Sequence, residues 1–105
     1  MLKNCVAVVT GASRGIGREI ALAFAKAGAS LVLASRNEEG LHKTRVEIER
    51  LGSEGFVVPT DITKPGNVKN LTERTLEHFG RVDVLVNNSG IGGPSAQLWE
   101  IDLPD

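Results

Sequence analysis

Residues Val6-Ala7-Val8-Val9-Thr10 lead directly into Gly11-Ala12-Ser13-Arg14-Gly15-Ile16-Gly17, and this stretch decides the fold. The run from residue 6 to residue 9 is apolar without alternating polar residues, which predicts a strand buried on both faces. The glycines predict a turn, and the apolar spacing that follows predicts a helix. A helix that opens after such a turn offers unpaired N–H groups and a partial positive charge, so the stretch predicts a phosphate site.

Each glycine of the turn has an expected role. Gly11 allows the sharp turn out of the strand, Gly15 lets the backbone approach phosphates, and Gly17 lets the helix pack close to the sheet. The inner face of this first helix is predicted to consist of Ile16, Ile20, Ala23, Phe24 and Ala27.

The rest of the chain repeats the alternation of strand and helix. Further strands are predicted at 31–34, 56–58 and 82–86. We predict that Asn37 caps a second helix and Thr63 a third, and that glycines 28, 52 and 80 end the three helices. Strands joined by helical crossovers are parallel, which predicts a doubly wound α/β (Rossmann) sheet of order 3-2-1-4 with helices on both faces. The inner faces of the later helices are predicted to be Leu41, Thr44, Ile48 and Leu51, and Val68, Leu71, Thr72, Thr75 and Phe79.

Composition narrows the possible partners. The 105 residues suffice for one domain, and a net charge of −1 without a basic run gives no reason to expect nucleic acid or an anionic membrane as partner. The single cysteine, Cys5, is expected to be an inert core thiol. His42 and His78 have no metal-ligand neighbour at useful spacing, so no metal site is expected. The start of the chain lacks a signal sequence, and the expected compartment is the cytoplasm.

Four motifs in a fixed order resemble the short-chain dehydrogenase/reductase family. They are the Thr-Gly-x-x-x-Gly-x-Gly spacing of residues 10–17, Ser35-Arg36-Asn37, Asp61-Ile62 and Asn87-Asn88-Ser89-Gly90. The resemblance implies the N-terminal, dinucleotide-binding half of an oxidoreductase that transfers hydride between nicotinamide and a carbonyl or alcohol substrate. Residues 1–105 are then an incomplete Rossmann half-domain.

The residues after the second strand bear on the choice of cofactor. NAD-binding relatives carry an acidic residue there, but residues 34–37 contain no carboxylate. Arg14 and Arg36 can instead donate in-plane hydrogen bonds to a 2′-phosphate, and the resemblance points the same way. We therefore expect NADP (NADPH) rather than NAD, by roughly tenfold to a few thousandfold. The alternative is that both arginines are solvated surface residues.

The remaining contacts are implied by the resemblance. The Asp61 carboxylate accepts a hydrogen bond from the adenine amino group and the Ile62 N–H reaches a ring nitrogen; alternatively Asp61 only shapes the turn before the third helix. Residues 87–90 contact the cofactor ribose largely through their backbone. Ser89 departs from the family's usual alanine. The expected cofactor-binding set is Gly11, Ser13, Arg14, Gly15, Ile16, Gly17, Ser35, Arg36, Asn37, Asp61, Ile62, Asn88, Ser89 and Gly90.

The sequence predicts no catalytic residue in this chain. The family's catalytic serine, tyrosine and lysine follow the fifth strand, and these 105 residues contain no tyrosine. A substrate is therefore expected only for the complete protein. The alternative function is a nucleotide-binding module, or an inactive fragment, without turnover.

The edge of the fourth strand carries a further expectation. With the sheet truncated after residues 82–86, that edge would hold unpaired backbone groups, which predicts self-association through it. Residues 99–103 are expected to approach a further helix.

Overall fold

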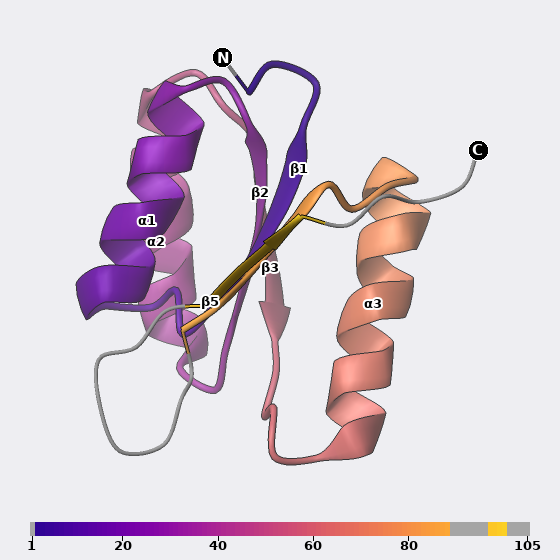
Figure 1. Ribbon diagram of the computed structural model, residues 1–105. Coiled ribbons are helices and arrows are strands. Elements are labelled where there is room, and N and C mark those ends of the chain that lie inside the picture. The colour runs from indigo at the N-terminus through magenta and orange to yellow at the C-terminus, as the bar shows by residue number, and fades with distance from the viewer. Residues whose placement is uncertain (1, 89–96, 101–105) are drawn as a thin grey trace.

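The computed structural model describes residues 2–88 and 97–100. A central sheet has α1 and α2 on one face and α3 on the other (Figure 1). The elements are β1 (Val6–Thr10), α1 (Gly15–Lys26), β2 (Ser30–Ser35), α2 (Glu38–Arg50), β3 (Gly55–Pro59), α3 (Pro65–Phe79), β4 (Val84–Asn87) and β5 (Gln97–Glu100).

The sheet has the order β3-β2-β1-β4-β5, and its first four strands in this order are parallel. The predicted order 3-2-1-4 is therefore confirmed. Val8 of β1 pairs with Val32 of β2 on one side and with Leu85 of β4 on the other. β1 lies inside the sheet, so the turn that follows it opens between the carboxyl ends of its neighbours.

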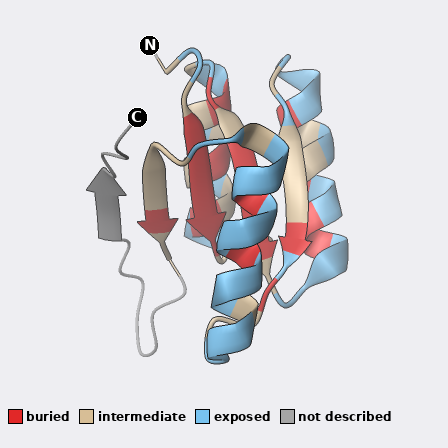
Figure 2. Cartoon of the chain, turned by 90° about the vertical axis from the view of Figure 1, so that its right-hand side faces the viewer, coloured by how far each residue is buried: buried red, intermediate tan, exposed pale blue. Residues whose placement is uncertain are grey.

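Alternation along the strands builds a core on each face of the sheet. Ala7 and Val9 pack on the side of α1 and α2, whereas Val6 and Val8 pack on the side of α3. All four are at most 5% exposed. Figure 2 shows the central strands β1 and β2 largely buried between helices whose outer faces are exposed. This double burial explains why β1 is a continuous apolar run.

The predicted inner face of α1 is wrong in part. The buried row is Gly17, Ala21 and Ala25, while Ile16 is 48% exposed and Ala23 is also exposed. Ile20 and Phe24 pack only partly against the core. Residues of small volume allow a close approach of helix and sheet, which turns the larger side chains to the flank. Leu51 and Val68, both predicted to face inward, are also more than 40% exposed.

The edge of β4 differs from the expectation. β5 pairs antiparallel with β4, from Val84 opposite Glu100 to Asn87 opposite Gln97. The backbone groups on that edge of β4 are hydrogen-bonded, which removes the free edge on which we based self-association. Residues 99 and 100 lie in this strand, and residues 101–103 of the expected approach to a helix lie outside the described residues. No helix in the described ranges, 2–88 and 97–100, is long and apolar enough to cross a membrane.

Asp83 joins the beginnings of β1 and β4. Its Oδ2 accepts a hydrogen bond from the Val6 N–H at 2.7 Å, its Oδ1 accepts one from Arg81 Nε at 3.1 Å, and its own N–H donates to the Val6 carbonyl at 2.9 Å. Burial raises the pKa of this carboxyl, but the hydrogen bonds from Arg81 and Val6 outweigh it and the pKa lies below its ordinary value.

We expect Asp83→Ala to lower the free energy of unfolding at pH 7 by about 1–3 kcal/mol, because the buried Val6 N–H loses its acceptor. Since the folded-state pKa is lowered, this contribution is complete above the unfolded-state pKa and disappears as the pH falls below about 4. Urea denaturation at pH 7 and pH 3 measures both effects. The exposed Glu73→Ala variant is the control, and equal urea midpoints for Asp83→Ala and Glu73→Ala at pH 7 would contradict the assignment.

Candidate functional site

The turn between β1 and α1 has the backbone that its glycines predict. Gly11 and Gly15 adopt φ values of +65° and +61°, in the left-handed region. α1 begins at Gly15, and the N-cap residue Arg14 makes no side-chain cap hydrogen bond. The first N–H groups of α1 are therefore available to an anion, and open space lies where a Cβ of Gly15 would stand.

Gly17 keeps α1 close to the turn. A Cβ at this position would overlap the Gly11 carbonyl group and stand 2.7 Å from Asn88 Nδ2. Real side chains do not approach so closely, so position 17 admits only glycine at this helix–turn distance. The expected packing role of Gly17 is confirmed, and its nearest neighbours are the Gly11 carbonyl and the Asn88 amide.

A cavity of about 620 Å³ opens at the carboxyl ends of β1, β2 and β3. Three separate turns line it, one after each strand. Its lining residues are Gly11, Ser13, Arg14, Ser35, Arg36, Asn37, Thr60, Asp61, Ile62 and Thr63. Most of the residues expected from the sequence to bind the cofactor thus surround one space.

Arg14 and Arg36 lie far apart in the sequence but reach this cavity from different turns. Both are exposed. Their positive charges face a single negative charge, that of Asp61, among the cavity's lining residues. The arrangement suits an anion that carries more than one negative charge.

Ser35 and Asn37 hold the turn after β2. The Asn37 N–H donates to Ser35 Oγ at 3.0 Å, and Asn37 Oδ1 accepts from the Gly40 N–H at 3.0 Å. The predicted cap of α2 by Asn37 is therefore confirmed. Both side chains already serve the turn that presents Arg36.

Asp61 is oriented by its own turn. Its Oδ1 accepts from the Thr63 hydroxyl at 2.6 Å and from the Thr63 N–H at 3.0 Å, while its N–H donates to Asn67 Oδ1 at 3.2 Å. The prediction that Thr63 caps α3 is wrong, because its hydroxyl donates to this charged acceptor two residues back; the N-cap residue is Lys64. Among the described residues no hydrogen bond reaches Asp61 Oδ2, so this oxygen is available to a ligand donor.

The Thr63 hydroxyl and N–H lower the pKa of the Asp61 carboxyl, and the charges of Arg36 and Lys64 act in the same direction. We expect Thr63→Val to move this pKa back up toward its ordinary value, because one donor is lost. Side-chain carboxyl shifts of Asp61, followed by NMR against pH, measure the change. Thr63→Ser retains the hydroxyl and serves as control; equal pKa values in the valine and serine variants would show that the hydroxyl has no such effect.

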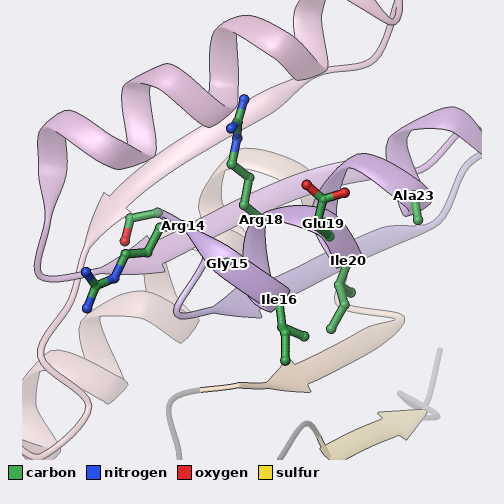
Figure 3. A pocket seen from close by; sticks show the side chains of 8 residues that line it. Arg14, Gly15, Ile16, Arg18, Glu19, Ile20 and Ala23 are labelled. Atoms are coloured by element: carbon green, nitrogen blue, oxygen red, sulfur yellow. The ribbon is translucent and has the colours of Figure 1, made fainter. Parts of the chain in front are cut away.

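A second cavity, of about 570 Å³, adjoins the first at Ser13 and Arg14. It is lined by the flank of α1, including Gly15, Ile16 and Ile20. Ile16 and Ile20 point to the same side, whereas Arg14 extends away from them (Figure 3). The exposure of Ile16 thus places an apolar surface beside the turn between β1 and α1, although Ile16 was predicted to face the core.

Thr10 connects β1 to the end of β4. Its hydroxyl accepts from the Asn88 N–H at 2.9 Å and lies 3.1 Å from Asn87 Oδ1. These contacts tie β1 to β4 through the two asparagines. Ser89 and Gly90, also expected at the cofactor, lie outside the described residues.

Thr60 and Thr63 line the main cavity but were absent from the expected set. Their position in the sequence could have indicated this, because both directly flank Asp61-Ile62 at the end of a buried strand. Within the part of the chain that the structure describes, no cluster of histidine, cysteine, aspartate and glutamate residues could hold a metal ion.

Comparisons with known proteins agree with this architecture. The family model described as "short chain dehydrogenase" matches residues 5–103. A 1-deoxy-11-beta-hydroxypentalenate dehydrogenase from Streptomyces exfoliatus is 39% identical over 103 residues, which cover 97% of this chain and 38% of that protein.

Solved structures of dehydrogenases share the fold of this chain. A hydroxysteroid dehydrogenase from Escherichia coli has a TM-score of 0.84 and 41% identity, covering 88% of this chain and 39% of that one. An alcohol dehydrogenase from Thermococcus sibiricus, complexed with 5-hydroxy-NADP, has a TM-score of 0.75 and 43% identity, covering 77% of this chain and 35% of that one. The chain spans less than half the length of these relatives.

Proposed function

This chain belongs to the short-chain dehydrogenase family, and from that premise we propose that it is the NADP(H)-binding part of an oxidoreductase. One observation carries the proposal: Arg14 and Arg36 line the same cavity, next to a helix N-terminus without a side-chain cap. The complex of the Thermococcus sibiricus relative with 5-hydroxy-NADP supports the same class of ligand.

The residues present fit such a cofactor. The N–H groups at the start of α1 would hold the diphosphate, where the left-handed glycines keep the backbone free of side chains. Arg14 and Arg36 would hold the 2′-phosphate. Asp61 Oδ2 would accept from the adenine amino group, with the carboxylate kept ionised and fixed by Thr63.

When bound, the nicotinamide would exchange hydride with a carbonyl or alcohol substrate. This chain's own part is to bind and orient the cofactor. In the complete protein, the family's serine, tyrosine and lysine would carry out the proton transfer. These 105 residues contain no tyrosine. The substrate is thus proposed as a small carbonyl or alcohol compound, taken by the complete protein.

Calorimetric titration of the chain with NADPH and with NADH tests the proposal. We expect NADPH to bind at least about tenfold more tightly, because only NADPH engages both arginines through a 2′-phosphate. Equal affinity for the two dinucleotides would contradict the cofactor assignment, and no binding of either would contradict the proposed function.

A second candidate is a nucleotide-binding module without turnover. Under both candidates we expect the purified chain to oxidise no NADPH in the presence of a panel of aldehydes and ketones. Loss of NADPH absorbance that depends on added carbonyl compound would show that these 105 residues include catalytic residues.

A further inference from the structure

The first turn of α2 lies directly against the glycine turn. Gly40 is buried there, and a Cβ at this position would stand 2.8 Å from Ser13 Cβ and 3.0 Å from the Ser13 carbonyl oxygen. Both distances are shorter than ordinary contacts of a side chain. The contact between the two segments therefore depends on the missing side chain of residue 40.

One turn later, α2 makes a second contact with the same segment. The hydroxyl of Thr44, which is fully buried, donates to the Ala12 carbonyl oxygen at 2.9 Å. Ala12 is buried as well. Without this hydroxyl its carbonyl oxygen would lose that hydrogen bond in the protein interior, so the bond fixes the turn onto α2.

The same end of α2 also fixes the turn that carries Arg36. The Gly40 N–H donates to Asn37 Oδ1, and the Asn37 N–H donates to Ser35 Oγ, both at 3.0 Å. α2 therefore touches the segment that bears Arg14 and the segment that bears Arg36 within one helical turn. The relative position of the two arginines follows from these contacts.

We propose that Gly40 and Thr44 are positioning residues that set the distance between the two arginine-bearing turns, and thereby the preference for a 2′-phosphorylated dinucleotide. The inference rests on the proposed function. Neither residue lines the cavity, so neither is proposed to contact the ligand. Two guanidiniums can share one phosphate only when held within about 0.5 Å of the productive geometry, which a shift of either turn would exceed.

The test measures the ratio of the affinities for NADPH and NADH by calorimetry. In Gly40→Ala the turns must separate, so NADPH affinity should fall about tenfold more than NADH affinity. The control is Gly66→Ala in the first turn of α3, where a Cβ meets nothing within 4 Å. This control should leave both affinities unchanged. If Gly40 had a purely structural role, Gly40→Ala would lower the affinities for NADPH and NADH equally. The ratio of the two affinities would then stay unchanged.

A second pair of variants decides the matter if Gly40→Ala does not fold. Thr44→Val removes the hydrogen bond to Ala12 and should lower the NADPH/NADH affinity ratio several-fold, whereas Thr44→Ser should restore it. If the wild-type chain binds NADPH and the ratio is unchanged in the folded variants, the inference is wrong and the proposed function stands. If the wild-type chain binds neither dinucleotide, the proposed function fails and the inference with it.

Discussion

Replacing Arg14 or Arg36 by alanine is expected to weaken NADPH binding by about 10- to 100-fold for each residue, because each loses charged hydrogen bonds worth about 1.5–3 kcal/mol. Both side chains are exposed, so the lower end of this range is expected in physiological salt. NADH has no 2′-phosphate, and its affinity should change by less than about threefold, through the loss of general positive charge alone. Calorimetric titration of each variant with both dinucleotides measures the difference.

Two further variants separate shape from charge. Arg36→Lys keeps the positive charge but loses the planar fork, so it should recover only part of the NADPH affinity. Arg50→Ala removes an exposed arginine that lies at the end of α2 and does not line the cavity. It should bind both dinucleotides as the wild-type chain does. If Arg14→Ala and Arg36→Ala lowered the affinities for NADPH and NADH equally, both arginines would be solvated surface residues that do not bind the 2′-phosphate.

The second large effect is expected at Gly17. In Gly17→Ala the new Cβ overlaps the Gly11 carbonyl group, which is backbone and cannot move aside without shifting the turn or α1. We expect a loss of about 2 kcal/mol or more in unfolding free energy, or roughly 10 °C in Tm for a domain of this size. Dinucleotide binding should be lost with it, because the displaced element carries the phosphate site.

Gly66→Ala is again the matched control, since it also replaces a glycine near the start of a helix. Its Cβ meets open space, and the change should stabilise the chain by about 0.5–1 kcal/mol through helix propensity. Thermal denaturation followed by circular dichroism measures both variants. A Tm for Gly17→Ala equal to that of the wild-type chain would show that the helix does not need to approach the turn so closely.

The sheet could be predicted from the sequence because its signals are local. The apolar runs of β1 and β2 are buried on both faces, and helical crossovers leave few possible orders for their neighbours. The convergence of Arg14 and Arg36 followed from this topology, since turns at the carboxyl ends of adjacent parallel strands meet at one edge.

Other features depend on contacts between distant segments. The inner face of α1 could not be predicted from apolar spacing, because Gly17, Ala21 and Ala25 are buried for their small volume while the larger Ile16 lies on the flank. Thr63 has the residue type of a helix cap, yet its hydroxyl donates to the charged carboxylate two residues before it. The pairing of β5 with β4 likewise has no local sequence signal.

We propose that the diphosphate and the 2′-phosphate bind in the cavity between the turns after β1, β2 and β3. At 11.2 kDa the chain is suited to amide NMR, and a titration with NADPH locates the binding site directly. We predict the largest amide shift changes at residues 13–17, 36–37 and 61–62. Changes concentrated instead along α3, around Val68 and Leu76, with the amides of the turn between β1 and α1 unmoved, would show that the cofactor does not bind in this cavity.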